Sequence, residues 1–224
     1  MSASVSLTER RKAATRMEIA RAAAGLFVKH GLRASRAEDI AQAACIAPRT
    51  FYRYFATKEE AVAPLYAAGA QLWAEAVREA PAHLPVPEAL EHAVRHTLTP
   101  GAGVSASSWA WVRTLIRLAE TSPGLRKVWA EVCQAGERTL VEVLAERVGE
   151  HRGERQGEGA DNVAGDSVVS ADLRFAAAVA SAAVRTAVEA WVAGDEPAEG
   201  EAGPAGLALR NLALLREFPW EERG

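Results

Sequence analysis

The chain has 224 residues, of which 49% are hydrophobic and 25% charged, a composition typical of a globular protein with one or two domains. Its longest uninterrupted apolar stretches, such as residues 175–180, are far shorter than the roughly 20 residues that cross a bilayer. The N-terminus also lacks the apolar core of a signal peptide. These features argue against membrane-spanning and secreted proteins, and they predict a cytoplasmic protein with no membrane partner.

The net charge of −3 is unevenly distributed. Residues 1–60 hold 11 Lys and Arg against 6 Asp and Glu, whereas the remaining 164 residues hold 15 against 23. The N-terminal part is therefore basic and the rest acidic, which places any affinity for nucleic acid in the N-terminal part. The only two cysteines, Cys45 and Cys133, each lie in an apolar helical pattern. They are expected to be buried, reduced thiols, with a redox switch as the alternative.

Residues 1–14 are expected to form a flexible arm, whose basic cluster at residues 10–12 could either reach DNA or stay solvated. A first helix is predicted over residues 16–30. The pattern Thr-x-x-Glu at residues 15–18 fits a capping box at its start, and Gly31 suits its end.

Two short helices joined by a tight turn at residues 44–47 are predicted next. Apolar residues recur at helical spacing before the turn, and Pro48 suits the first position of the following helix because its missing N–H would be unpaired there. Phe51 and Phe55 share one face of that helix, which suits a core. The remaining side chains point outward: Arg49, Thr50, Tyr52, Arg53 and Tyr54. Such a surface suits phosphates and base edges, so the pattern predicts a helix-turn-helix with residues 48–54 as recognition helix. A helix pair that never touches DNA is the alternative.

The identities of individual residues in this region give further information. They include Gly31, Ser35, Ile40-Ala41, Ala44, Thr50-Phe51-Tyr52, Tyr54-Phe55 and Thr57-Lys58-Glu59. Together these positions resemble the signature of the TetR family of transcriptional regulators, densely over about residues 14–62 and by helix layout beyond. Three positions depart from the family pattern. Arg36 stands where Thr is usual, Cys45 where Gly is most frequent, and Ala47 where Ser or Thr caps the recognition helix, a loss that typically costs about 1 kcal/mol.

The DNA-binding residues expected from the pattern and the resemblance lie on either side of the turn. They are Ser35, Arg36, Arg49, Thr50, Tyr52, Arg53, Tyr54 and Lys58. Ser35 is expected to cap the helix before the turn and to contact a phosphate. Arg36 is expected to contact a phosphate as well. Arg49 and Arg53 are expected to contact bases or phosphates, with Thr50 and Tyr52 beside them. Tyr54 is expected to hold a phosphate, and so is Lys58, at the start of a helix whose capping box spans residues 57–60.

The rest of the chain is predicted to be helical. Helices are expected over residues 58–80, 87–99, 107–120, 125–148, 172–193 and 204–217, with a mobile loop at 149–169. The fold class is therefore all-α with about nine helices: a flexible arm at 1–14, a DNA-binding domain of three helices at 15–60, and a helical ligand-binding and dimerisation domain at 61–224. Small apolar residues at helical spacing form a stripe over residues 176–191. The stripe suits a seam between subunits formed by the last two helices, as in the family, or else covers the protein's own core.

No pattern of catalytic residues is recognised, and neither an enzymatic activity nor a cofactor is expected. His92 and His96 share a helix face without a third ligand, so no metal site is expected. A pocket for a small molecule is expected where the family has one. Its candidate residues are His92, Trp109, Arg113, Trp129, Cys133 and Trp191. The alternative is that the tryptophans are ordinary core residues.

The resemblance implies a homodimeric repressor that binds an inverted-repeat operator in double-stranded DNA. A small effector, expected to be apolar or aromatic, would release it. The alternatives are a regulator that senses no small molecule, acting as constitutive repressor or activator, and a helical ligand-binding protein that does not bind DNA.

Overall fold

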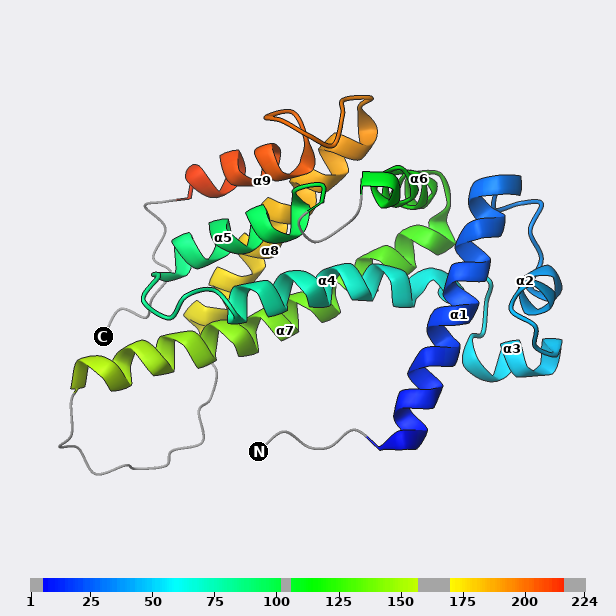
Figure 1. Ribbon diagram of the computed structural model, residues 1–224, viewed down its shortest axis with the longest axis horizontal. Helices are drawn as coiled ribbons and strands as arrows, with labels where there is room; N and C mark the ends of the chain where they lie inside the picture. The colour runs from blue at the N-terminus through cyan, green and yellow to red at the C-terminus, as the bar shows by residue number, and fades with distance from the viewer. Residues whose placement is uncertain (1–5, 102–105, 157–169, 216–224) are drawn as a thin grey trace. The chain divides into compact units, whose positions relative to one another are not determined.

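The computed structural model describes residues 6–101, 106–156 and 170–215 (Figure 1). Within these ranges the chain forms nine α-helices and one 3-10 helix, η1, without a β-strand, and the predicted all-α class is confirmed. The elements are α1 (Leu7–His30), α2 (Ala37–Ala43), α3 (Pro48–Tyr54), η1 (Glu60–Val62), α4 (Ala63–Arg78), α5 (Val86–Leu98), α6 (Ala106–Thr121), α7 (Pro123–Gln156), α8 (Ala171–Ala193) and α9 (Pro204–Ala213).

The chain divides into two compact units. The head unit comprises Met1–Gly69 and Trp111–Val132, and the body unit comprises Ala70–Ala110 and Cys133–Gly224. The divisions fall within α4, α6 and α7. The predicted boundary between the DNA-binding domain and the rest lies after residue 60. In the structure, the head unit contains the beginning of α4, the end of α6 and the beginning of α7 as well.

Large apolar side chains from α1, α2, α3 and η1 form the core of the head unit. The fully buried ones are Ile19, Phe27, Ile40, Phe51 and Val62. Burial of each side chain of this kind stabilises the fold by roughly 1.5–3 kcal/mol. Because α2 and α3 have only seven residues each, they are too short to be stable alone. The shared core therefore holds them in place.

Tyr66 connects three helices within the head unit. Its hydroxyl, at the beginning of α4, donates to the carbonyl of Leu115 in α6 over 2.8 Å. Its ring meets that of Trp129 in α7 edge to face, with centroids 5.1 Å apart. Burial raises the pKa of Tyr66 well above its ordinary value, so the phenol remains a neutral donor.

Helix α1 begins at Leu7, and the expectation of a flexible arm through residue 14 is wrong from that residue on. Ser6 caps it by accepting from the N–H of Glu9 over 3.2 Å. Thr15, which was predicted to cap the helix, lies inside it and donates to the carbonyl of Arg11 over 3.1 Å. Ser6 and Glu9 have the same capping pattern as Thr15 and Glu18, and α1 begins at the first of these two patterns.

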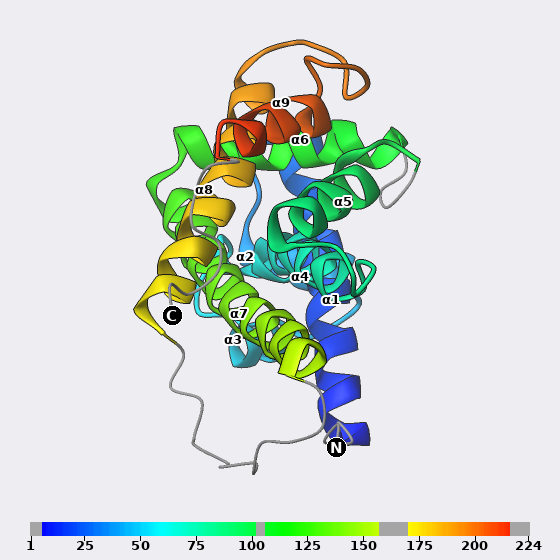
Figure 2. The ribbon, with the colours of Figure 1, turned by 90° about the vertical axis from the view of Figure 1, so that its left-hand side faces the viewer.

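The core of the body unit is built by α4, α5, α7, α8 and α9. Helix α9 packs against α8 and α5 (Figure 2). The predicted stripe on α8 lies in this core: Ala176, Ala180 and Ala187 are at most 1% exposed. The stripe therefore covers the protein's own core, which was the alternative to a seam between subunits. By length and composition alone α8 could cross a membrane, but a buried core helix passes the same test.

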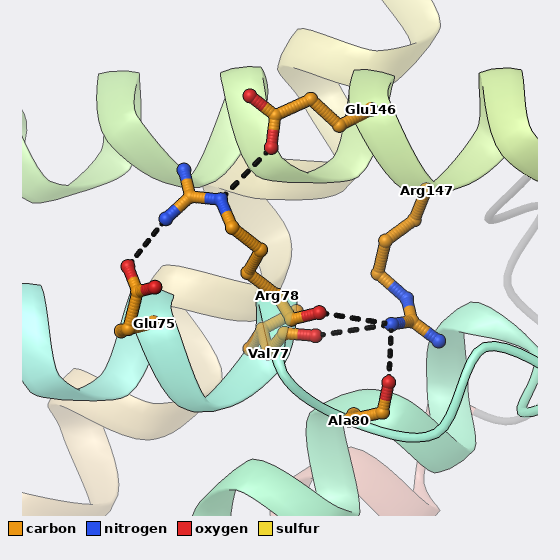
Figure 3. A network of polar contacts seen from close by, with 6 residues as sticks. All are labelled: Glu75, Val77, Arg78, Ala80, Glu146 and Arg147. Carbon is orange, nitrogen blue, oxygen red and sulfur yellow. Dashed lines mark hydrogen bonds and ion pairs between the residues drawn. The ribbon is translucent and has the colours of Figure 1, made fainter. Parts of the chain in front are cut away.

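Arg147 fastens the end of α4 to α7 within the body unit (Figure 3). It is 3% exposed, and its guanidinium donates to the carbonyls of Val77, Ala80, Pro81 and Leu84 over 2.8–3.3 Å. Beside it, Arg78 pairs with Glu146 over 2.9 Å and also with Glu75. The last carbonyls of a helix have no partner within the helix, and Arg147 satisfies that of Val77 together with three carbonyls of the segment after α4.

Several predicted helix ends need correction. Helix α7 runs to Gln156, so the predicted mobile loop is helical over residues 149–156, and residues 157–169 lie outside the described residues. Helix α9 ends at Ala213 rather than at residue 217. The helix predicted from residue 58 starts as η1 and continues as α4 from Ala63. The capping hydroxyl of Thr57 was predicted correctly, since it accepts from the N–H of Glu60 over 3.3 Å.

Candidate DNA-binding interface

The entry to α2 differs from the prediction. Ser35 does not cap this helix. It is 2% exposed and donates its hydroxyl proton to the carbonyl of Gly31 over 2.9 Å. The N-cap is Arg36, whose backbone N–H donates to the carboxylate of Asp39 over 2.9 Å. The side chain of Arg36 is 75% exposed and lies 3.5 Å from the carboxylate of Glu38. The side chain of Arg36 is therefore accessible to a ligand, whereas that of Ser35 is buried.

The turn between α2 and α3 closes by a double hydrogen bond. The N–H of Ile46 donates to the carbonyl of Ala41 over 2.9 Å, and that of Cys45 to the carbonyl of Gln42 over 3.0 Å. This arrangement, a Schellman motif, requires a left-handed residue after the C-cap. Cys45 takes that place with φ of 54°. The family preference for Gly at this position has the same physical cause, because Gly adopts positive φ without strain.

Helix α3 has the bounds and the faces that the sequence predicted. Ala47 is its N-cap, without a side-chain hydrogen bond, and Pro48 follows at its start. Phe51 is fully buried, and Phe55, just beyond the end of the helix, is 3% exposed. Their ring centroids lie 5.9 Å apart. The burial of this face fixes which side chains of α3 remain on the surface.

The surface face of α3 carries two cations and a phenol. Arg49 and Arg53 are exposed, and Tyr52 is 53% exposed. Thr50 and Tyr54 are half-buried beside them. The guanidinium of Arg53 lies 5.4 Å from the ring centroid of Tyr54. Such a face can donate hydrogen bonds to phosphate oxygens and base edges without rearrangement of the backbone.

Lys58 makes two contacts within the protein that were not predicted from the sequence. Its ammonium donates to the carbonyls of Leu32 and Ser35, over 2.7 and 2.9 Å. It therefore fastens the loop that precedes α2 to the segment that follows α3. An ammonium has three N–H donors, and these two contacts leave the third for another acceptor.

Arg16 in α1 also contacts the helix-turn-helix, a contact that was not predicted from the sequence. It donates to the carbonyl of Tyr54 over 3.1 Å. Its guanidinium lies 4.6 Å from the ring centroid of Phe55. A signal for this contact existed, because residues 16, 20, 23 and 27 follow helical spacing. Arg16 therefore continues the buried face of α1 beyond Ile19.

The residues predicted to line a ligand pocket are divided between the two units. Trp109 and Trp191 meet edge to face in the body unit, with centroids 5.4 Å apart. Cys133 is half-buried in the same unit, and His92 is exposed there. Arg113 and Trp129 belong to the head unit. A hollow of about 400 Å³ in the head unit is lined by other residues: Leu26, His30, Ala34, Ser35, Asp39, Gln42 and Ala43.

The two thiols differ in exposure. Cys45 is exposed, and the expectation that it is buried is wrong because the left-handed turn turns its side chain outward. Cys133 is partly buried, and burial raises its pKa to about 11. Arg185 lowers that pKa and Glu189 raises it, both by less than burial does.

Comparison with known proteins agrees with this geometry. Residues 19–63 match the family model described as bacterial regulatory proteins, tetR family. The HTH-type transcriptional regulator TcmR of Streptomyces glaucescens is 30% identical over 145 residues, and the match spans 64% of this chain and 64% of that relative's length.

Solved structures share the fold over almost the whole chain. FadR of Thermus thermophilus, a TetR-family transcriptional repressor, has a TM-score of 0.54 at 24% identity, over 93% of this chain and 97% of that one. The fatty acid degradation regulator FadR of Bacillus halodurans has a TM-score of 0.53 at 20% identity, over 90% and 94%. GusR of Salmonella enterica has a TM-score of 0.52 at 19% identity, over 91% and 94%. Residues 19–63, which contain the helix-turn-helix, thus match the TetR family of bacterial regulatory proteins, and the solved structures show that the chain shares their fold.

Proposed function

We propose that this protein is a cytoplasmic, sequence-specific DNA-binding regulator that acts as a homodimeric repressor. The observation that carries the proposal is the division of α3 into two faces. Phe51 is buried in the head core, while Arg49 and Arg53 are exposed with Tyr52 between them. Placed in a major groove, this face would bring guanidiniums to base edges and phosphates.

The contacts we propose follow the exposure of each side chain. Arg49 and Arg53 would contact bases or phosphates, with Thr50 and Tyr52 beside them. Arg36 and Tyr54 would hold phosphates at the edges of the same surface. Lys58 would add its third N–H to a phosphate while it holds the loop at Leu32. Ser35 is omitted, because its hydroxyl proton is donated to Gly31.

The dimer is proposed to form through α8 and α9, as the family resemblance suggests. Because the stripe on α8 is buried in the protein's own core, the contact would use the opposite faces of these helices. Phe175 in α8 and Leu214, the C-cap residue of α9, are 62% and 81% exposed. Two copies related by a two-fold axis would read an inverted repeat, with half-sites about 34 Å or a multiple of that apart.

A small apolar or aromatic effector is proposed to bind in the body unit and release the DNA. The Trp109–Trp191 pair supports this proposal, because the indole N–H of Trp109 is buried and meets no acceptor among the described residues. An oxygen of the effector would satisfy it. The Thermus thermophilus FadR structure holds lauroyl-CoA, and we propose a comparable use of the fold here. Release requires that the effector bind the DNA-free form more tightly.

The decisive experiment is selection of bound duplexes from a random DNA pool, followed by affinity measurements on the selected duplex at several salt concentrations. We expect an inverted repeat whose affinity falls steeply as salt rises. The double variant Arg49→Ala, Arg53→Ala should lose this selectivity. Arg126→Ala, at an exposed arginine of the head unit outside the helix-turn-helix, should keep it. If no sequence is enriched and binding is weak and uniform, the regulator proposal is wrong.

A further inference from the structure

We infer that Arg16 is a positioning residue for DNA reading: from α1, it holds the C-terminal end of the recognition helix in the orientation that α3 needs. This side chain lies outside the residues predicted to contact DNA. The inference rests on the proposed function, since positioning of α3 matters for function only if α3 reads DNA.

Two contacts define the position of the Arg16 side chain. Its Nη1 donates to the carbonyl of Tyr54, the last residue of α3, over 3.1 Å. Its guanidinium carbon lies 4.6 Å from the ring centroid of Phe55, the C-cap residue, which is 3% exposed. One contact fixes the backbone at the end of α3, and the other stacks the cation on the aromatic anchor that follows.

Helix α3 has little other support at its ends. It has seven residues, and its N-cap, Ala47, offers no side-chain acceptor to the free N–H groups. At the other end the N–H of Phe55 donates to the carbonyl of Phe51. The carbonyl of Tyr54 is among those that lack a partner within the helix. A cation at this end satisfies that carbonyl and opposes the negative end of the helix dipole.

The same contacts indicate that Arg16 does not bind a DNA phosphate directly. Arg16 is half-buried, and its planar face is covered by Phe55. In contrast, Arg49 and Arg53 are exposed on α3 itself. Arg16 should therefore affect DNA binding through the orientation of α3. The salt dependence of binding separates this positioning role from a direct phosphate contact. Loss of a phosphate contact lowers the slope of log K against log salt by about one, whereas loss of positioning leaves it unchanged.

The test compares Arg16→Gln and Arg16→Lys with Arg21→Gln in the full-length protein. Arg21 is exposed on the same helix, so its substitution removes the same charge without touching α3. Binding to the selected operator and to a random duplex is measured at several salt concentrations, well below the unfolding temperature. We expect Arg16→Gln to lower the ratio of operator to random affinity about tenfold, the equivalent of one hydrogen bond to a charged group, with an unchanged slope. Arg16→Lys, which keeps the charge but not the planar stack, should fall between Arg16→Gln and the wild type, and Arg21→Gln should match the wild type.

A second measurement needs no DNA. Hydrogen exchange of the Phe55 amide, which closes the last turn of α3, should be several-fold faster in Arg16→Gln than in Arg21→Gln, while the core amide of Phe27 is unchanged. An unchanged Phe55 amide overturns the inference, and so does an unchanged affinity ratio, which would mean a merely structural role. A slope lowered by about one would identify a phosphate contact instead. If the wild type selects no operator but the Phe55 amide responds, the positioning of α3 stands and the proposed regulator function fails.

Discussion

The guanidinium of Arg147 donates to the carbonyl of Ala80 over 2.8 Å, across the turn that follows α4 (Figure 3). Ala80 is 4% exposed, so this carbonyl has little access to water. An unpaired buried carbonyl costs about 1–3 kcal/mol. Arg147 serves several carbonyls at once, and its cation lies at the negative end of the α4 dipole. One side chain of α7 thus stabilises both the end of α4 and the turn that leads to α5.

Replacement of Arg147 by Met should therefore be strongly destabilising. We expect a loss of about 2–4 kcal/mol in the free energy of unfolding, because carbonyls at the end of α4 lose their donor while the apolar stem is kept. Urea unfolding followed by circular dichroism measures it. Arg138→Met on the same helix, at an exposed position, should change stability by less than about 0.5 kcal/mol. A similar small effect for both variants would contradict the role assigned to Arg147.

The left-handed backbone at Cys45 predicts a stabilising substitution. With φ of 54°, any side chain with a Cβ is strained by about 1–2 kcal/mol, whereas Gly is not. Gly in turn loses about 0.5–1 kcal/mol more conformational entropy on folding. Cys45→Gly should accordingly stabilise the head unit by about 0.5–1 kcal/mol over Cys45→Ala, which keeps the strain. The difference between their urea midpoints tests this, and Cys45→Ala equal to or more stable than Cys45→Gly would refute it.

The sequence was most informative where an element carries an unambiguous end signal. Helix α3 was predicted with its correct bounds because Pro48 marks its start and the pair Phe51 and Phe55 marks its buried face. Helix α8 was predicted to within one residue. The start of α1 was missed because Ser6 and Thr15 both begin a capping pattern, and residues 6–14 are exposed. No apolar periodicity could therefore show that the helix extends toward Ser6.

Long-range contacts of charged side chains were not predictable in the same way. The ammonium of Lys58 donates to the carbonyl of Leu32, which is distant in sequence. The contacts of Arg147 were not predicted, because nothing in local spacing shows that it faces the end of α4. Both depend on tertiary geometry. The tryptophans of the predicted pocket have ring partners that local spacing did not indicate: Trp129 packs on Tyr66 in the head unit, and Trp191 packs on Trp109 in the body unit.

The two thiols should react at different rates with a maleimide or a disulfide reagent. Cys45 is exposed and should react fast. Burial raises the pKa of Cys133 to about 11, and only the thiolate is reactive. The rate at Cys133 should hence rise about tenfold per pH unit between pH 7 and 9, in step with its thiolate fraction. Mass spectrometry of single-cysteine variants measures both rates. A Cys133 rate that levels off below pH 9 would show that its pKa is not raised.

Two glycines inside helices should respond oppositely to replacement by Ala. Gly69 in α4 is exposed, and an added Cβ would meet nothing within 4 Å. Gly69→Ala should therefore stabilise the protein by about 0.5–1 kcal/mol, the usual cost of a glycine in a helix. Gly136 in α7 lies against α4, and a Cβ there would be 3.0 Å from the Cβ of Ala70.

At Gly136 the helix-propensity gain is opposed by this overlap, because the two helices would have to move apart by a few tenths of an ångström in a packed region. Gly136→Ala should be neutral or destabilising, and Gly136→Val, which is larger, should cost about 1–3 kcal/mol. Urea midpoints of the three variants decide the matter. A Gly136→Ala variant as stabilised as Gly69→Ala would mean that the close approach of α4 and α7 at Ala70 does not require glycine.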